Sequence, residues 1–153
     1  MDVFPNLDLI GQPDYHEALR GLAPNAAAGV DLLVIYDGAL DFLTRVLNAA
    51  GYDDPPLQAR LLEWTPKKGG IDLAGLVRHL GIKRVLLFGQ DAAALGLHFQ
   101  VVDYFPVEVS GVTYLRAPSA GQIAEAKANG DNGPAGALWR GVKAGYVRER
   151  LVL

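Results

Sequence analysis

The sequence predicts an α/β protein of three layers, in which helices cover both faces of a central four-stranded parallel sheet. Short apolar runs rich in β-branched and aromatic residues are typical of strands buried on both faces. These runs alternate with helical patterns, which favours a parallel sheet. The two clearest runs, IKRVLLFGQD at 82–91 and VTYLRAPS at 112–119, end abruptly in small and polar residues. Open α/β folds place their ligand sites at such strand ends.

Length and composition indicate one globular domain. The chain has 153 residues, of which 50% are hydrophobic and 20% charged, and its net charge is −3. Binding phosphates needs a concentrated positive surface, so the overall charge gives no footprint for nucleic acid, although a weak contact through a local basic patch stays open. The absence of cysteine excludes a disulfide framework and a thiolate nucleophile.

Residues 1–28 are interpreted as an N-terminal arm, and residues 29–153 as the single α/β domain. The arm holds scattered apolar residues, turn formers and a short helical stretch around 15–22. It either lies on the domain or is reserved for a partner. The side chains expected to contact a partner are Phe4, Leu7, Leu9 and Ile10. The arm lacks the basic and apolar regions of a secretory signal, and no apolar run reaches the ~18 residues of a membrane span, so a cytoplasmic protein without membrane contact is expected.

The first strand is expected over residues 30–36, where VDLLVIY is almost continuously apolar. Apolar residues then recur at three- and four-residue steps over 40–50, which predicts a helix that Gly51 ends. A second strand is expected over 57–64. Together these elements form the beginning of an alternating strand and helix pattern.

Asp72 is placed to cap the N-terminus of the next helix, and Gly81 to end it. The third strand follows over 82–88, and a short helix is expected over 92–95. The fourth strand is expected over 109–115.

The last two helices begin at recognisable signals. Ser119 and Gln122 have the spacing of a capping box, which predicts a helix that runs to about Lys127. Pro134 suits the first turn of a final helix. The residues expected to point inward from that helix are Leu138, Trp139, Val142 and Tyr146.

Two candidate sites follow the first and third strands. Asp37 stands where an α/β enzyme would place a general base, although Asp-Gly is also a common turn pair. Gly89, Gln90 and Asp91 form the turn after the third strand and are candidates for anion or nucleotide binding. Neither GxGxxG nor the P-loop spacing accompanies them, so a purely structural turn is the alternative.

A third candidate for anion binding is Pro118 with Ser119, at the start of a helix. A serine there caps the helix or contacts a phosphate through the same free N–H groups. The histidines are widely separated in the sequence, so no metal site and no cofactor are expected. They are His16, His79 and His98.

The second half resembles the C-terminal half of the uracil-DNA glycosylase superfamily in two features, a Phe-Gly turn after the third strand and a Pro-Ser pair before a helix. In that superfamily a histidine that contacts the uracil carbonyl usually precedes Pro-Ser, whereas Ala117 stands here. The first catalytic motif of the superfamily would fall near Asp37, but IYDGAL lacks the rest of its loop.

The chain after residue 28 also resembles the psi subunit of bacterial DNA polymerase III. The similarity lies in size, the strand ending in Asp-Gly, the helix LDFLTRVLNAAG, the RVLLFG strand, the APS loop and the closing ALWRGVKA helix. It implies a glycosylase-like fold with degenerate catalytic motifs, and a non-catalytic adaptor that links the clamp loader to a chi-like or single-strand-binding partner. The alternative is a divergent glycosylase or nucleotide-binding enzyme that uses Asp37 and Ser119.

Overall fold

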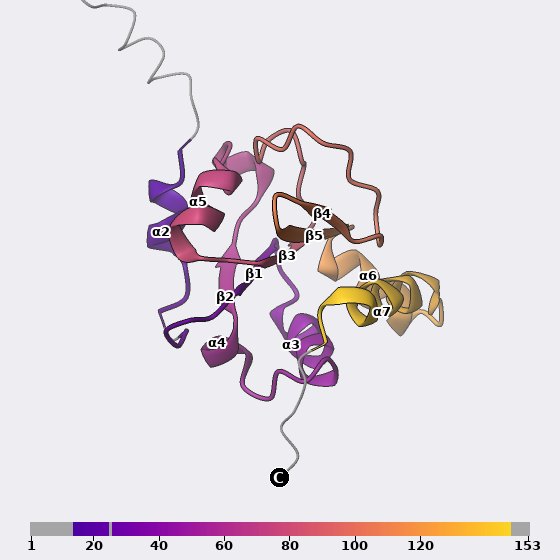
Figure 1. Ribbon diagram of the computed structural model, residues 1–153. Coiled ribbons are helices and arrows are strands. Elements are labelled where there is room, and N and C mark those ends of the chain that lie inside the picture. The colour runs from indigo at the N-terminus through magenta and orange to yellow at the C-terminus, as the bar shows by residue number, and fades with distance from the viewer. Residues whose placement is uncertain (1–13, 25, 148–153) are drawn as a thin grey trace, which may run out of the picture.

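The protein is built around one five-stranded mixed sheet (Figure 1), in a computed structural model that describes residues 14–24 and 26–147. The strand order is β2-β1-β3-β5-β4. The strands are β1 (Leu32–Tyr36), β2 (Arg60–Glu63), β3 (Arg84–Phe88), β4 (Val107–Val109) and β5 (Val112–Ala117). β2, β1, β3 and β5 pair in parallel, and β4 runs antiparallel to β5 at the edge.

The hairpin between β4 and β5 corrects the predicted sheet. One parallel strand was expected over 109–115, but the chain turns at Ser110 and Gly111, and Val109 pairs with Val112. The φ angles of Ser110 and Gly111 are 53° and 80°. Positive φ at both central residues is the requirement of a two-residue type I′ hairpin turn, which Ser-Gly can meet. The prediction of four parallel strands alone is therefore wrong, because an antiparallel edge strand completes a mixed sheet.

Six α-helices and one short 3₁₀ helix lie in the described residues. They are α2 (His16–Gly21), α3 (Leu40–Ala49), α4 (Pro55–Gln58), η1 (Pro66–Lys68), α5 (Leu73–Leu80), α6 (Ala120–Ala128) and α7 (Gly133–Gly145). The predicted signals of α5 are confirmed, since the Asp72 carboxylate accepts a hydrogen bond of 3.1 Å from the Gly75 N–H and Gly81 adopts φ 70°. Residues 92–95 form turns instead of the expected helix.

The second strand begins later than expected because α4 occupies residues 55–58. Pro55 and Pro56 stand in its first turn, where a missing N–H costs nothing. β2 then starts at Arg60 and pairs with β1.

The helices divide between the two faces of the sheet (Figure 1). α3, α6 and α7 cover one face, and α2 and α5 cover the other. Alternate residues of β1 belong to the two cores, Leu32 and Val34 to the first and Leu33 and Ile35 to the second, and all four are fully buried. Burial on both faces accounts for the continuous apolar run in the sequence.

The described part of the N-terminal segment lies on the domain. Ala18 of α2 is buried in the second core, Leu22 forms a bridge with Leu62, and the Ala23 N–H donates to the Leu61 carbonyl at 3.0 Å. The predicted partner contacts lie outside the described residues; they are Phe4, Leu7, Leu9 and Ile10. No helix in the described ranges is long and apolar enough to cross a membrane.

Two glycines of α7 should respond oppositely to alanine. A Cβ on Gly141 would lie 2.6 Å from the Tyr104 carbonyl oxygen and 3.1 Å from a Leu115 methyl, whereas a Cβ on Gly136 would meet only the Arg140 guanidinium, at 3.6 Å. We expect Gly141→Ala to lower the free energy of unfolding by about 1–2 kcal/mol, because overpacking against backbone outweighs the gain in helix propensity. Gly136→Ala should raise it by about 0.5–1 kcal/mol. Urea denaturation followed by circular dichroism measures both, and stabilisation by Gly141→Ala would contradict the close packing of α7.

Candidate functional site

The topological switch point of the sheet lies at the carboxyl ends of β1 and β3. The chain leaves β1 into α3 on one face and leaves β3 into a connection whose Leu95 and Leu97 pack in the core of the other face, so the two connections diverge at this edge. Ligands of open α/β sheets bind in the crevice that such divergence creates. Asp37 follows β1 and Gly89 follows β3, and both were candidates on sequence grounds.

Three of the predicted site residues meet at this point. The Ser119 hydroxyl, at the start of α6, donates a hydrogen bond of 3.1 Å to Asp37 Oδ1. Gly89 lies against the same carboxylate, so closely that a Cβ at this position would overlap Asp37 Oδ2. Gly89 also has φ 66°, a conformation that other residues adopt only with strain. The contacts therefore join the ends of β1, β3 and β5.

The predicted capping box of α6 does not form. Ser119 occupies the N-cap position, but its side chain makes no capping hydrogen bond, and Gln122 is exposed. The hydroxyl donates instead to Asp37, and a bond to an ionised carboxylate is stronger than a bond between neutral groups. A phosphate at this helix end would face the Asp37 carboxylate, and two unit charges about 4 Å apart near a protein surface repel by about 4 kcal/mol. The geometry thus disfavours an anion at the start of α6.

Gln90 turns inward and supports the sheet edge. Its side chain is buried, and Nε2 donates to the Trp64 carbonyl at 2.7 Å and to the Phe88 carbonyl at 3.0 Å. Both amide hydrogens are thereby used to join the end of β3 to the residue that follows β2. In this arrangement the side-chain amide of Gln90 has no N–H left to bind an anion.

Replacing Gln90 with leucine should destabilise the protein. The substitution keeps a side chain of similar size but removes the donor for two carbonyls, so we expect the free energy of unfolding to fall by about 1–2 kcal/mol. Gln122→Leu is the control, because this glutamine is exposed on α6 and surface changes stay within about 0.5 kcal/mol. Thermal unfolding of the two variants makes the comparison, and equal melting temperatures would refute the structural role of Gln90.

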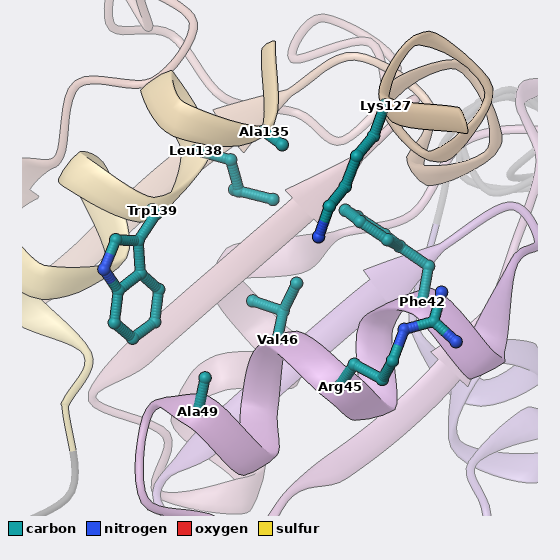
Figure 2. Close-up of a pocket in the computed structure, with 8 residues that line it drawn as sticks. All are labelled: Phe42, Arg45, Val46, Ala49, Lys127, Ala135, Leu138 and Trp139. Carbon is teal, nitrogen blue, oxygen red and sulfur yellow. The ribbon is translucent and has the colours of Figure 1, made fainter. Parts of the chain in front are cut away.

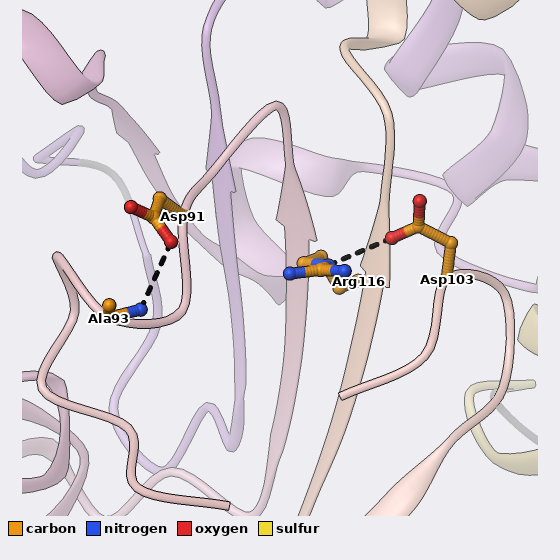
Figure 3. Close-up of polar contacts among 4 residues, drawn as sticks. All are labelled: Asp91, Ala93, Asp103 and Arg116. Atoms are coloured by element: carbon orange, nitrogen blue, oxygen red, sulfur yellow. Dashed lines mark hydrogen bonds and ion pairs between the residues drawn. The ribbon is translucent and has the colours of Figure 1, made fainter. Parts of the chain in front are cut away.

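Two further polar groups near this edge hold loops (Figure 3). Asp91 is exposed, and its Oδ1 accepts a hydrogen bond of 3.2 Å from the Ala93 N–H. Arg116 of β5 donates through Nε to Asp103 Oδ1 at 2.8 Å, and its carbonyl accepts from the Tyr104 N–H at 2.8 Å. These bonds fix the connection that precedes β4. Pro118, which is half-buried, offers no N–H to a ligand.

The four cavities characterised in the structure lie away from these residues. One lies between α3, α6 and α7, one at the amino-terminal edge of the sheet, one between residues 104–106 and α7, and one beside α5 and β5. Asp37, Gly89 and Ser119 line none of the four.

The histidines lie around the second face of the sheet. His16 stacks on Tyr15, whose ring centroid lies 5.5 Å from that of His79, and His98 lines the cavity beside α5. Within the described ranges, no group of three or more histidine, aspartate or glutamate residues could hold a metal ion.

The fold and the switch point define an α/β protein whose sheet-edge polar side chains bond to one another or to the backbone. Comparison with known protein families finds no match, and no curated protein matches the chain.

Proposed function

We propose that the protein is a non-catalytic adaptor of the bacterial replication machinery, similar to the psi subunit of DNA polymerase III, that acts in the cytoplasm. It would link the clamp loader to a chi-like or single-strand-binding partner. One observation supports this function best: the Asp37 carboxylate is hydrogen-bonded by Ser119 and packed against Gly89. A carboxylate placed in this way joins strand ends, whereas a general base must reach a substrate proton.

The glycosylase-like fold is part of the same proposal. In its support, the parallel part of the sheet has the order β2-β1-β3-β5, with helices on both faces. Ala117, where the superfamily usually has histidine, is buried in the first core at the end of β5. A methyl group there packs against the core and provides no hydrogen bond to a base.

Exposed apolar residues favour an interaction protein. Phe105 is 66% exposed and Val102 51% exposed, both in the connection before β4. Exposed aromatic side chains are enriched where proteins bind one another. For the clamp-loader contact we propose the four apolar residues of the N-terminal segment, Phe4, Leu7, Leu9 and Ile10.

Binding to purified clamp-loader and chi-like proteins tests this function. The full chain should retain both proteins on an affinity column. A variant with alanine at the four N-terminal apolar positions should lose the clamp loader and keep the chi-like protein. Circular dichroism must show that the variant is folded. If the unaltered chain retains neither protein, the adaptor function is refuted.

A second function is favoured by the convergence of Asp37, Gly89 and Ser119 at the switch point. A divergent glycosylase or nucleotide-binding enzyme would use Asp37 to orient water, and the α6 end would hold a phosphate once the Asp37 carboxylate had turned away from Ser119. Excision of uracil from a single-stranded oligonucleotide, abolished by Asp37→Ala and retained by Asp41→Ala, would establish this activity. Asp41 is the matched control because it is exposed in the first turn of α3. Lack of excision would favour the adaptor.

A further inference from the structure

The cavity between α3, α6 and α7 combines an apolar lining with two cations (Figure 2). Its volume is about 240 Å³. The apolar residues that line it are Phe42, Val46, Ala49, Ala135, Leu138 and Trp139. Arg45 of α3 and Lys127 of α6 complete the lining, and no acidic residue takes part. Figure 2 shows Lys127 extending toward Val46 and the Phe42 ring, with Trp139 across the cavity.

The two cations are available to a ligand. Among residues 14–24 and 26–147, neither Arg45 nor Lys127 forms an ion pair or a side-chain hydrogen bond. Both side chains are exposed. Two unpaired cations that approach one apolar cavity from different helices would complement a carboxylate on a partner.

The size of the cavity favours a single side chain as its occupant. A dry cavity of roughly 150 Å³ holds benzene, whereas pockets for drug-sized ligands have roughly 300–1,000 Å³. The volume between the three helices therefore suits one phenyl or branched aliphatic group. Tryptophan and arginine, both present here, are the residues that most often carry the binding energy of protein interfaces.

We propose that this cavity is a docking site for an acidic segment of a partner protein. One aromatic or aliphatic side chain of the segment fills the space between Phe42 and Trp139, and a flanking carboxylate lies between Arg45 and Lys127. Charge complementarity selects this occupant, because the lining is apolar and carries only positive charge. The proposed site does not depend on the identity of the partners proposed above. It would recognise any segment that carries an apolar side chain next to a carboxylate.

A fluorescein-labelled seven-residue peptide with a central phenylalanine flanked by aspartates is the probe. Fluorescence polarisation with the full chain should show saturable binding. The double variant Arg45→Glu with Lys127→Glu should bind at least about tenfold more weakly, because both attractive contacts become repulsive. The matched control is Arg78→Glu with Lys143→Glu, which changes the net charge equally at exposed sites outside this cavity and should bind within about twofold of the unaltered chain.

The apolar part of the site has its own test. A peptide with glycine in place of phenylalanine should bind at least about tenfold more weakly. Peptide binding should change the intrinsic fluorescence of the protein, because Trp139 lines the cavity. Trp139→Phe should remove this change, because the other tryptophan, Trp64, is buried outside the cavity with 4% exposure.

Four results would overturn the proposal. They are absence of saturable peptide binding, equal weakening by the control variant, preference for an oligothymidylate over the peptide, and a dimer in light scattering that the Arg45 and Lys127 reversals dissociate. The third would make the cavity a nucleic-acid site, and the fourth would make it an interface between copies of this chain. Retention of replication proteins on the column is a separate measurement, so the docking site and the adaptor function can fail independently.

Discussion

Replacing Tyr146 with alanine is expected to lower the free energy of unfolding by about 3–5 kcal/mol, because it removes a large buried side chain and leaves a cavity. Tyr146 follows α7 and is fully buried in the first core. Its hydroxyl faces the Val85 carbonyl at 2.7 Å and the Thr113 carbonyl at 3.0 Å, and its single proton serves both. The residue therefore fixes the end of α7 to β3 and β5. Urea denaturation measures the loss.

Tyr146→Phe separates the hydrogen bond from the packing. The ring stays, so we expect a loss of only about 1–2 kcal/mol from two carbonyls left without this donor. Tyr146→Ala and Tyr146→Phe should differ by the cost of the cavity. Equal stability of Tyr146→Ala and the unaltered protein would show that α7 is not held to the sheet in this way.

The difference in stability between the unaltered protein and Tyr146→Phe should depend on pH. Burial is the main cause that raises the pKa of Tyr146 above its usual value of 10.0. The folded protein thus keeps this proton at a pH where the unfolded chain has released it. The stability that the hydroxyl contributes is complete below pH 10 and is lost as pH rises above it. The difference in stability between the unaltered protein and Tyr146→Phe should therefore shrink with increasing alkalinity.

Part of the alkaline loss should remain in Tyr146→Phe. Burial also raises the pKa of Tyr36, where the Glu63 carboxylate adds to the effect, and of Tyr114. Their ionisation in the unfolded chain also lowers the stability of the protein as pH rises. A difference between the two proteins that is constant from pH 8 to about pH 11 would contradict the pKa shift of Tyr146.

The sequence predicts most of the fold because its strongest patterns depend on local chemistry. The apolar run of β1 reflects burial on two faces, and α5 is capped by Asp72 at its start and by Gly81 at its end through contacts within a few residues. The β4–β5 hairpin was missed because valines on both sides of Ser110 and Gly111 resemble one continuous strand. The Ser-Gly pair is a turn signal that could have divided it.

The candidate site was predictable in its location and not in its contacts. Asp37, Gly89 and Ser119 each follow a strand, and parallel strands bring such residues to one edge. The choice of Asp37 as the Ser119 partner joins positions 82 residues apart, and Gln90 turns inward to a carbonyl 26 residues away. No local sequence pattern indicates contacts between residues so far apart in the chain. The docking cavity likewise draws its lining from three helices and became visible only in the fold.

Gly89→Ala is expected to lower the free energy of unfolding by about 2–4 kcal/mol, the sum of strain at positive φ and loss of the Asp37–Ser119 hydrogen bond. The new Cβ would overlap the Asp37 carboxylate, and this flexible group must move away from the Ser119 hydroxyl. Gly81→Ala is the control, since Gly81 has φ 70° and open space around its Cβ position. It should cost only the backbone strain, about 1–2 kcal/mol.

The Asp37→Ala background then shows what the carboxylate does at the switch point. There Gly89→Ala should cost no more than Gly81→Ala, because the overlapping group is gone, and a double-mutant cycle measures the difference. Asp37→Ala alone should destabilise the protein by about 1–2 kcal/mol if the carboxylate joins the strand ends. Functional sites often hold groups at the expense of stability, so a stabilising Asp37→Ala would favour the enzyme over the adaptor. The sign of this one substitution thus links the stability of the sheet edge to the choice between the two functions.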